Sequence, residues 1–151
     1  ELKDLVQPLL AERGSGARLN GTPLRVSTCA TLVDALLCTG FPYSIREERR
    51  RQVDVFAAFL DEAQAVRRLG SAALDLCYVA AGRFDGFWEE RIHPWDIAAG
   101  ALIIEEAGGT VSGMDGAPFD AFAGLIAASN GPLQPLILDV VRRARHDAPA
   151  S

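Results

Sequence analysis

Residues 93–109 constrain the fold more than any other part of the chain, because they predict one helix with both ends marked. Asp96 is placed to act as the N-cap, with its carboxylate accepting from backbone N–H groups in the first turn, and Pro94 is expected just outside the helix. Gly108 and Gly109 supply a left-handed stop. The first two turns after Asp96 carry no charge, so the helix is expected to be buried on several sides.

A carboxylate at the start of a buried helix has two candidate roles. The helix dipole keeps Asp96 ionised and gives it a fixed direction, so that one oxygen can bond to the helix and the other can face a cation. A plain N-cap aspartate is the commoner outcome, and this segment by itself favours that interpretation.

The rest of the chain predicts strands and helices that alternate without a strict βαβ repeat. Residues 8–26 are predicted as a meander at a sheet edge with a type I′ turn at Asn20-Gly21, and residues 31–38 as a strand, with a helix as the close alternative. The later predictions are a helix over 45–66, a connector over 67–70, a helix over 71–82, a strand over 83–90, strands over 110–112 and 125–128, and a helix over 133–145. This order indicates one layered α/β domain with a mixed sheet over residues 1–151.

Charge and apolar content narrow the classes of function. The chain has 15 Lys and Arg against 20 Asp and Glu, and this net charge of -5 argues against nonspecific binding of nucleic acid. No apolar run approaches the roughly 20 residues of a membrane span, and no secretory signal is expected at the start. Cys29, Cys38 and Cys77 have apolar neighbours and no metal-type spacing, which predicts buried thiols in a reducing, cytoplasmic setting.

Two other places in the sequence offer functional groups. Gly70, Ser71 and Ala72 put small residues and free N–H groups at the start of a predicted helix, which suits an anion or a hydroxyl-rich ligand. An ordinary Ser N-cap is the alternative, and it has the greater weight until other residues join the site. Glu89 ends a predicted strand ahead of Asp96, so the two carboxylates can converge on one pocket. The alternative for Glu89 is a solvated charge at a strand end.

Several segments together resemble the inositol monophosphatase family, in the family's order and spacing. They are Gly-Ser-Gly-Ala-Arg-Leu-Asn-Gly at 14–21, Thr-Gly-Phe-Pro-Tyr at 39–43, Arg-Leu-Gly-Ser-Ala-Ala-Leu-Asp-Leu-Cys at 68–77, Trp-Asp-Ile-Ala-Ala-Gly at 95–100 and Glu-Ala-Gly-Gly at 106–109. The resemblance covers nearly all of residues 10–140. It implies alternating helix and sheet layers and a Mg²⁺-dependent phosphomonoesterase that acts on inositol monophosphate or a similar polyol phosphate.

The resemblance also implies a role for each candidate residue. Asp96 matches the family's aspartate that binds the second metal ion and touches a substrate hydroxyl, so it is the expected metal ligand and catalytic residue. Glu89 matches the glutamate that hydrogen-bonds to an inositol hydroxyl. Gly70, Ser71 and Ala72 match the helix start that contacts the substrate ring.

One part of the family's pattern is missing from the sequence. No Glu-Glu pair followed by an Asp-Pro-Ile-Asp-Gly-Thr loop, which together form the family's first metal cluster, occurs in it. The chain therefore resembles the C-terminal half of the pattern and is expected to be inactive by itself. Alternatives that stay open are a related phosphatase for histidinol phosphate, fructose bisphosphate or a nucleotide phosphate, and a non-catalytic α/β module. The expected partners are a small phosphate ester and a second copy in a homodimer, without nucleic acid or membrane.

Overall fold

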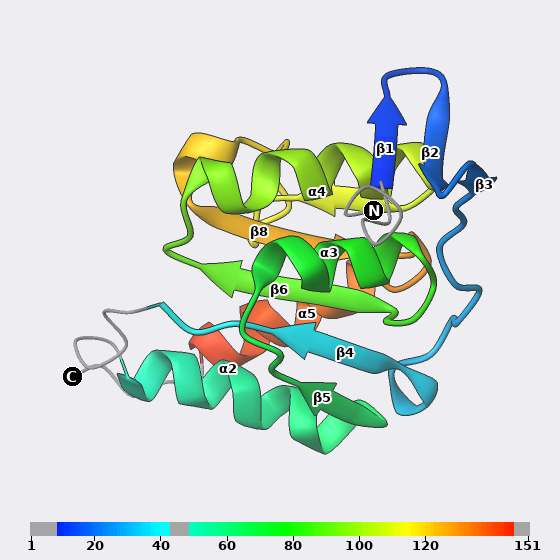
Figure 1. The fold of residues 1–151 in the computed structure, drawn as a ribbon. Helices are drawn as coiled ribbons and strands as arrows, with labels where there is room; N and C mark the ends of the chain where they lie inside the picture. The colour runs from blue at the N-terminus through cyan, green and yellow to red at the C-terminus, as the bar shows by residue number, and fades with distance from the viewer. Residues whose placement is uncertain (1–8, 43–48, 147–151) are drawn as a thin grey trace.

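The computed structural model describes residues 9–42 and 49–146, which stack in layers of helices and sheets (Figure 1). The central layer is a five-stranded sheet with the order β5-β4-β6-β8-β7. Its pairings are both parallel and antiparallel, so the predicted layered α/β fold with a mixed sheet is confirmed. Within the described residues, no helix is long and apolar enough to cross a membrane.

The strand that carries Glu89, one of the predicted site residues, lies in the middle of this sheet. β6 (Gly86–Glu90) pairs in parallel with β4 (Leu36–Thr39), which in turn pairs in parallel with the edge strand β5 (Ala65–Arg67). On its other side β6 pairs antiparallel with β8 (Leu125–Ser129), which pairs antiparallel with β7 (Thr110–Ser112).

Helices cover both faces of the sheet. α3 (Ala72–Ala80) and α4 (Pro94–Glu106) lie in front of it in Figure 1, and α5 (Gln134–His146) lies behind. α2 (Arg49–Glu62) shares the apolar cluster of α5. Alternation along β6 separates the two cores, because the Phe87 side chain joins the cluster of α3 and α4 whereas Trp88 joins the cluster of α2 and α5.

The predicted meander forms a sheet of its own. Within the described residues, β1 (Leu9–Glu12), β2 (Gly16–Leu19) and β3 (Thr22–Pro23) pair only with one another, so the expected position at the edge of a larger sheet is wrong. β1 and β2 contact α4. The Glu106 carboxylate at the end of α4 accepts from the Gly14 and Gly16 N–H groups, each at 2.8 Å. These bonds lower the pKa of Glu106 and hold the hairpin tip against the helix.

The type I′ turn is confirmed by positive φ angles of 51° at Asn20 and 79° at Gly21. The third strand ends at Pro23 instead of reaching Val26. The Val26 N–H donates to the Ala107 carbonyl at the end of α4, so the chain leaves the hairpin there.

Several predicted boundaries differ in the first half of the chain. Residues 31–38 contain a short 3₁₀ turn, Leu32–Asp34, before β4 begins. The helix predicted over 45–66 is described from Arg49 and ends at Glu62, and residues 43–48 lie outside the described residues. Residues Ala65–Arg67 form β5, which was predicted as part of that helix and its connector. Three residues are too few to show a period, and only pairing with β4 makes them a strand.

The buried face of α2 does not contain all of the helix's apolar residues. Val53 and Leu60 are 46% and 55% exposed, whereas Gln52 is buried. Among the cysteines, Cys38 is buried and Cys29 and Cys77 are partly exposed, so the predicted burial of all three thiols holds for Cys38. The other predicted elements are confirmed with boundaries shifted by a few residues.

The start of α4 corrects the predicted cap. His93 is the N-cap residue, Pro94 lies in the first turn, and the Asp96 N–H donates to the His93 carbonyl at 3.0 Å. Proline suits this place because its missing N–H would have no partner in the helix. Asp96 therefore lies within the first turn, at the positive end of the dipole, but it does not cap the helix. The predicted stop is confirmed, with Gly108 at a φ of 90°.

Burial of α4 is also less complete than predicted. Ile97, Gly100 and Ile104 face the core, but Trp95 is 77% exposed and Ala98 is also exposed. The helix is thus buried along one side and open on the other in the described chain.

Candidate active-site cleft

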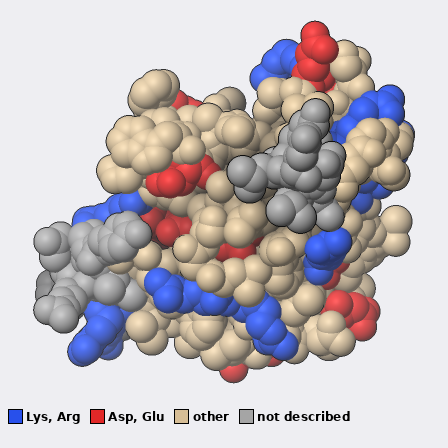
Figure 2. Space-filling view, viewed as in Figure 1, with Lys and Arg blue, Asp and Glu red and all other residues tan. Residues whose placement is uncertain are grey.

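A cleft of about 630 Å³ opens where the end of β6 meets the starts of α3 and α4. All five predicted site residues line it: Gly70, Ser71, Ala72, Glu89 and Asp96. In Figure 2 acidic side chains gather in a hollow near the centre of the face, and basic side chains lie below it. The predicted convergence of Glu89 and Asp96 on one pocket is therefore confirmed, and the start of α3 joins them there.

Glu89 reaches the cleft because it is one of the last residues of β6. Its backbone pairs with Ile126 of β8, and its side chain points to the face covered by α3 and α4. Gly40 lies directly against the carboxylate, since a Cβ at position 40 would sit 2.1 Å from Glu89 Oε2. Gly40 also lines the cleft, where the absence of a side chain leaves room for the Glu89 carboxylate. Nothing in the sequence signalled this role, because it depends on a contact between residues far apart in the chain.

The electrostatics of the cleft disfavour a charge on Glu89. Burial raises the pKa of Glu89 to about 7, the negative charges of Asp75 and Asp96 add to the rise, and Arg68 opposes it. A carboxyl group with this pKa is partly protonated at neutral pH and can both donate to and accept from a hydroxyl group. Arg68 also lies over the Phe41 ring, 5.5 Å from its centroid, at the rim of the cleft.

Asp75 is a cleft residue that the sequence analysis did not single out. It is 1% exposed, and its Oδ1 atom has no hydrogen-bond partner within the described part of the chain. Burial raises the pKa of Asp75 to about 6. A signal for it existed in the sequence, because Asp75 is the one charged residue in the apolar helix Ala72–Ala80.

Within the described residues, the start of α3 has no side-chain cap. Ser71 occupies the N-cap position with an extended backbone, but its hydroxyl makes no capping hydrogen bond. Gly70, with a φ of 94°, makes the turn that leads into it. The N–H groups of a first helical turn have no partners within the helix, so this end of α3 can bind an anion or a hydroxyl-rich group.

The described residues fit part of a metal site but not a whole one. Asp96 and Glu89 provide the hard oxygen atoms that Mg²⁺ prefers. Within residues 9–42 and 49–146, however, there is no group of three or more His, Cys, Asp or Glu side chains that could hold a metal ion. Mg²⁺ in proteins is usually bound through one or two carboxylates, with waters and substrate phosphate oxygens completing its octahedral coordination, so Asp96 is chemically suited to be one protein ligand of such a site.

Comparison with known proteins decides the family. The sequence profile of the inositol monophosphatase family matches residues 5–146. The chain belongs to the inositol monophosphatase family.

Several proteins similar to this chain are longer than it. The chain is 48% identical to an inositol-1-monophosphatase of Synechocystis over 118 residues, which are 78% of this chain and 41% of the relative. It is 44% identical to the Nus factor SuhB of Escherichia coli over 138 residues, 91% of this chain and 52% of that one. The structure of an inositol monophosphatase from Anabaena matches with a TM-score of 0.88 and 39% identity, over 93% of this chain and 58% of that chain. The chain thus spans about half the length of the curated relatives it matches.

Proposed function

We propose that the full-length protein is a Mg²⁺-dependent phosphomonoester hydrolase that acts on inositol monophosphate or a similar polyol phosphate. The observation that carries this proposal is the single cleft in which Glu89, Asp96 and the start of α3 meet. Membership of the family and the name of the Synechocystis relative, inositol-1-monophosphatase, support it.

Each of the cleft residues has a proposed role in binding the ester. The N–H groups around Gly70, Ser71 and Ala72 bind hydroxyl oxygens of the substrate ring, helped by the positive end of the α3 dipole. The Glu89 carboxylate accepts from a ring hydroxyl. Asp96, in the first turn of α4, offers one oxygen to a divalent cation and the other to the substrate.

The cation supplies an activated water and polarises the phosphoryl oxygen when it is bound. In this proposal Asp96 is the metal ligand that this chain contributes. The described residues hold no group of three such ligands, so further protein ligands would come from a region like the one that the matched relatives have beyond the aligned half.

A related phosphatase for a substrate with a second anionic group is the competing proposal. Arg68 and Arg91 both line the cleft and would suit the extra charge of fructose bisphosphate or a nucleotide phosphate. Glu89 favours the polyol instead, because a carboxylate accepts from hydroxyl groups and repels an anion.

A phosphate-release assay on the full-length protein tests these proposals. The panel contains inositol monophosphate, histidinol phosphate, fructose bisphosphate and a nucleotide monophosphate, each with and without Mg²⁺. We expect Mg²⁺-dependent release, fastest from inositol monophosphate. Faster release from the bisphosphate or the nucleotide would favour the competing proposal, and no release from any ester would favour a non-catalytic module.

A further inference from the structure

Glu90, the residue after Glu89, is a buried carboxylate on the opposite face of the sheet. It is 3% exposed and lies under α2 and α5, whereas Glu89 faces the cleft. The two side chains point to opposite faces because successive residues of a strand alternate. A charge this deeply buried costs free energy unless other groups compensate it.

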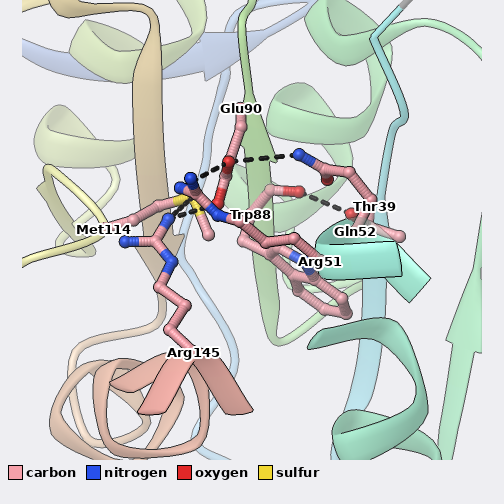
Figure 3. A network of polar contacts seen from close by, with 7 residues as sticks. All are labelled: Thr39, Arg51, Gln52, Trp88, Glu90, Met114 and Arg145. Carbon is pink, nitrogen blue, oxygen red and sulfur yellow. Dashed lines mark hydrogen bonds and ion pairs between the residues drawn. The ribbon is translucent and has the colours of Figure 1, made fainter. Parts of the chain in front are cut away.

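Three donors from two helices converge on the Glu90 carboxylate (Figure 3). On α2, Arg51 Nη2 lies 3.0 Å and Gln52 Nε2 3.1 Å from Glu90 Oε2. On α5, Arg145 donates to Glu90 Oε1, and its Nη2 also lies 3.6 Å from Met114 Sδ. Both carboxylate oxygens are therefore engaged, and this group of four residues, the Glu90 cluster, joins β6 to both helices of that face.

In the part of the chain that the structure describes, backbone pairing holds the end of β6 on one side only. The ladder between β4 and β6 ends at the pair Thr39 and Trp88. Among the described residues, Glu89 and Glu90 pair only with β8, opposite Ile126 and Leu125. A strand end with one neighbour frays more readily than one with two, so the side chain of Glu90 supplies the missing second anchor.

The chain after Glu90 makes a sharp turn before α4 begins. Arg91 has a left-handed φ of 54°, which is unusual for a residue with a side chain. α4 beyond the turn is held by its own apolar contacts, through Ile97 and Ile104. Loss of the cluster should therefore disturb Glu89 more than Asp96.

We propose that Glu90 is a positioning residue: its bonds to Arg51, Gln52 and Arg145 fix the end of β6 and so aim the Glu89 carboxylate at the substrate hydroxyls. This inference rests on the proposed function of the cleft. Stability alone does not account for the arrangement, because a buried ion pair adds little net stability compared with apolar residues of similar size. What an ion pair with fixed hydrogen bonds does provide is a defined orientation.

The test compares Glu90→Gln with a matched control in the full-length protein. The control is Glu62→Gln, since Glu62 pairs with Arg143 at 2.8 Å and also joins α2 to α5, but at the opposite end of α2 from Arg51. We expect Glu90→Gln to raise KM for inositol monophosphate by up to about 100-fold, the cost that a misplacement of about 1 Å can have, and to change KM for p-nitrophenyl phosphate much less. Glu62→Gln should change neither. Equal effects on both substrates, or the same effect in Glu62→Gln, would overturn the proposal.

The double variant Glu89→Gln/Glu90→Gln separates positioning from general damage. If Glu90 acts through Glu89, the double variant should bind the polyol no worse than Glu89→Gln alone. Multiplied losses would mean that Glu90 acts independently of Glu89, and would overturn the proposal.

Amide hydrogen exchange provides a readout that needs no activity. We expect faster exchange at residues 89–92 in Glu90→Gln than in the unmodified protein or in Glu62→Gln. Unchanged exchange there would overturn the positioning role whatever the activity. If the unmodified protein hydrolysed no phosphomonoester, the proposed function would fail, and faster exchange in Glu90→Gln would still show that the cluster holds the strand end.

Discussion

Replacing Glu89 with glutamine should stabilise the metal-free protein and weaken its binding of a polyol phosphate. The two effects have opposite signs because the same buried carboxylate is unfavourable in the folded protein and favourable for the substrate. Damage to the fold would instead lower both the stability of the protein and its affinity for the polyol phosphate.

The size of the gain in stability follows from the pKa of Glu89. Its rise from 4.5 to about 7 in the folded protein corresponds to a cost of about 3 kcal/mol for the ionised form. A raised carboxyl pKa gives stability that is fully present below about pH 4.5 and is lost as the pH rises through about 7. At pH 8 the Glu89→Gln substitution removes this cost but buries an amide, so we expect a net gain of about 1–2 kcal/mol.

The loss of binding follows from the hydrogen bond that glutamine cannot replace in kind. A charge-assisted hydrogen bond to a substrate hydroxyl contributes about 1.5–3 kcal/mol, so KM for inositol monophosphate should rise about 10- to 150-fold. A small ester such as p-nitrophenyl phosphate has no ring hydroxyl for Glu89 to bind, and its KM should change much less.

Urea unfolding of the metal-free protein at pH 5 and pH 8, together with steady-state kinetics on both esters, measures these effects. The stabilisation should be present at pH 8 and nearly absent at pH 5. A loss of stability at pH 8 would refute the argument from burial. An equal rise in KM for both esters would refute the assignment of Glu89 to the substrate hydroxyls.

Three other predictions test the cleft and its completeness. Asp96→Asn in the full-length protein should raise the Mg²⁺ concentration for half-maximal turnover roughly 10–100-fold in a metal titration. The melting temperature should change little, because Asp96 is not the helix cap. A marked fall in melting temperature together with the loss of turnover would assign Asp96 a structural role. Gly40→Ala should raise KM for inositol monophosphate, because its Cβ would lie 2.1 Å from Glu89 Oε2 and would push the carboxylate aside. It should cost less than about 1 kcal/mol in urea unfolding, because the displaced group is the end of a flexible side chain. An unchanged KM would show that the position of the Glu89 carboxylate does not matter for the substrate. Residues 1–151 expressed alone should release no phosphate, because the described part of the chain holds no group of three possible metal ligands. They should also self-associate in light scattering, because Trp95 and Phe122 are 77% and 87% exposed. A monomer with Mg²⁺-dependent turnover would contradict both expectations.

Features set by neighbouring residues were predictable from the sequence. The hairpin at Asn20-Gly21 needs only two residues that tolerate positive φ, and the stop after α4 needs only a glycine such as Gly108. The five candidate site residues stood at predicted strand ends and helix starts, the family resemblance gave them their site roles, and the structure places all of them in one cleft. The predicted cap of α4 was wrong because two local preferences competed. Aspartate favours the N-cap position and proline favours the first turn, and Pro94 in the first turn places the N-cap at His93.

Pairing and burial between distant residues decided the rest. The three residues of β5 are a strand because β4 lies beside them, and the hairpin of β1 and β2 stands on α4 because Glu106 binds its tip. In the sequence Glu89 and Glu90 are two adjacent charges. Only the sheet, with different helices on its two faces, makes one a cleft residue and the other a buried anchor, since each side chain's surroundings come from segments far along the chain.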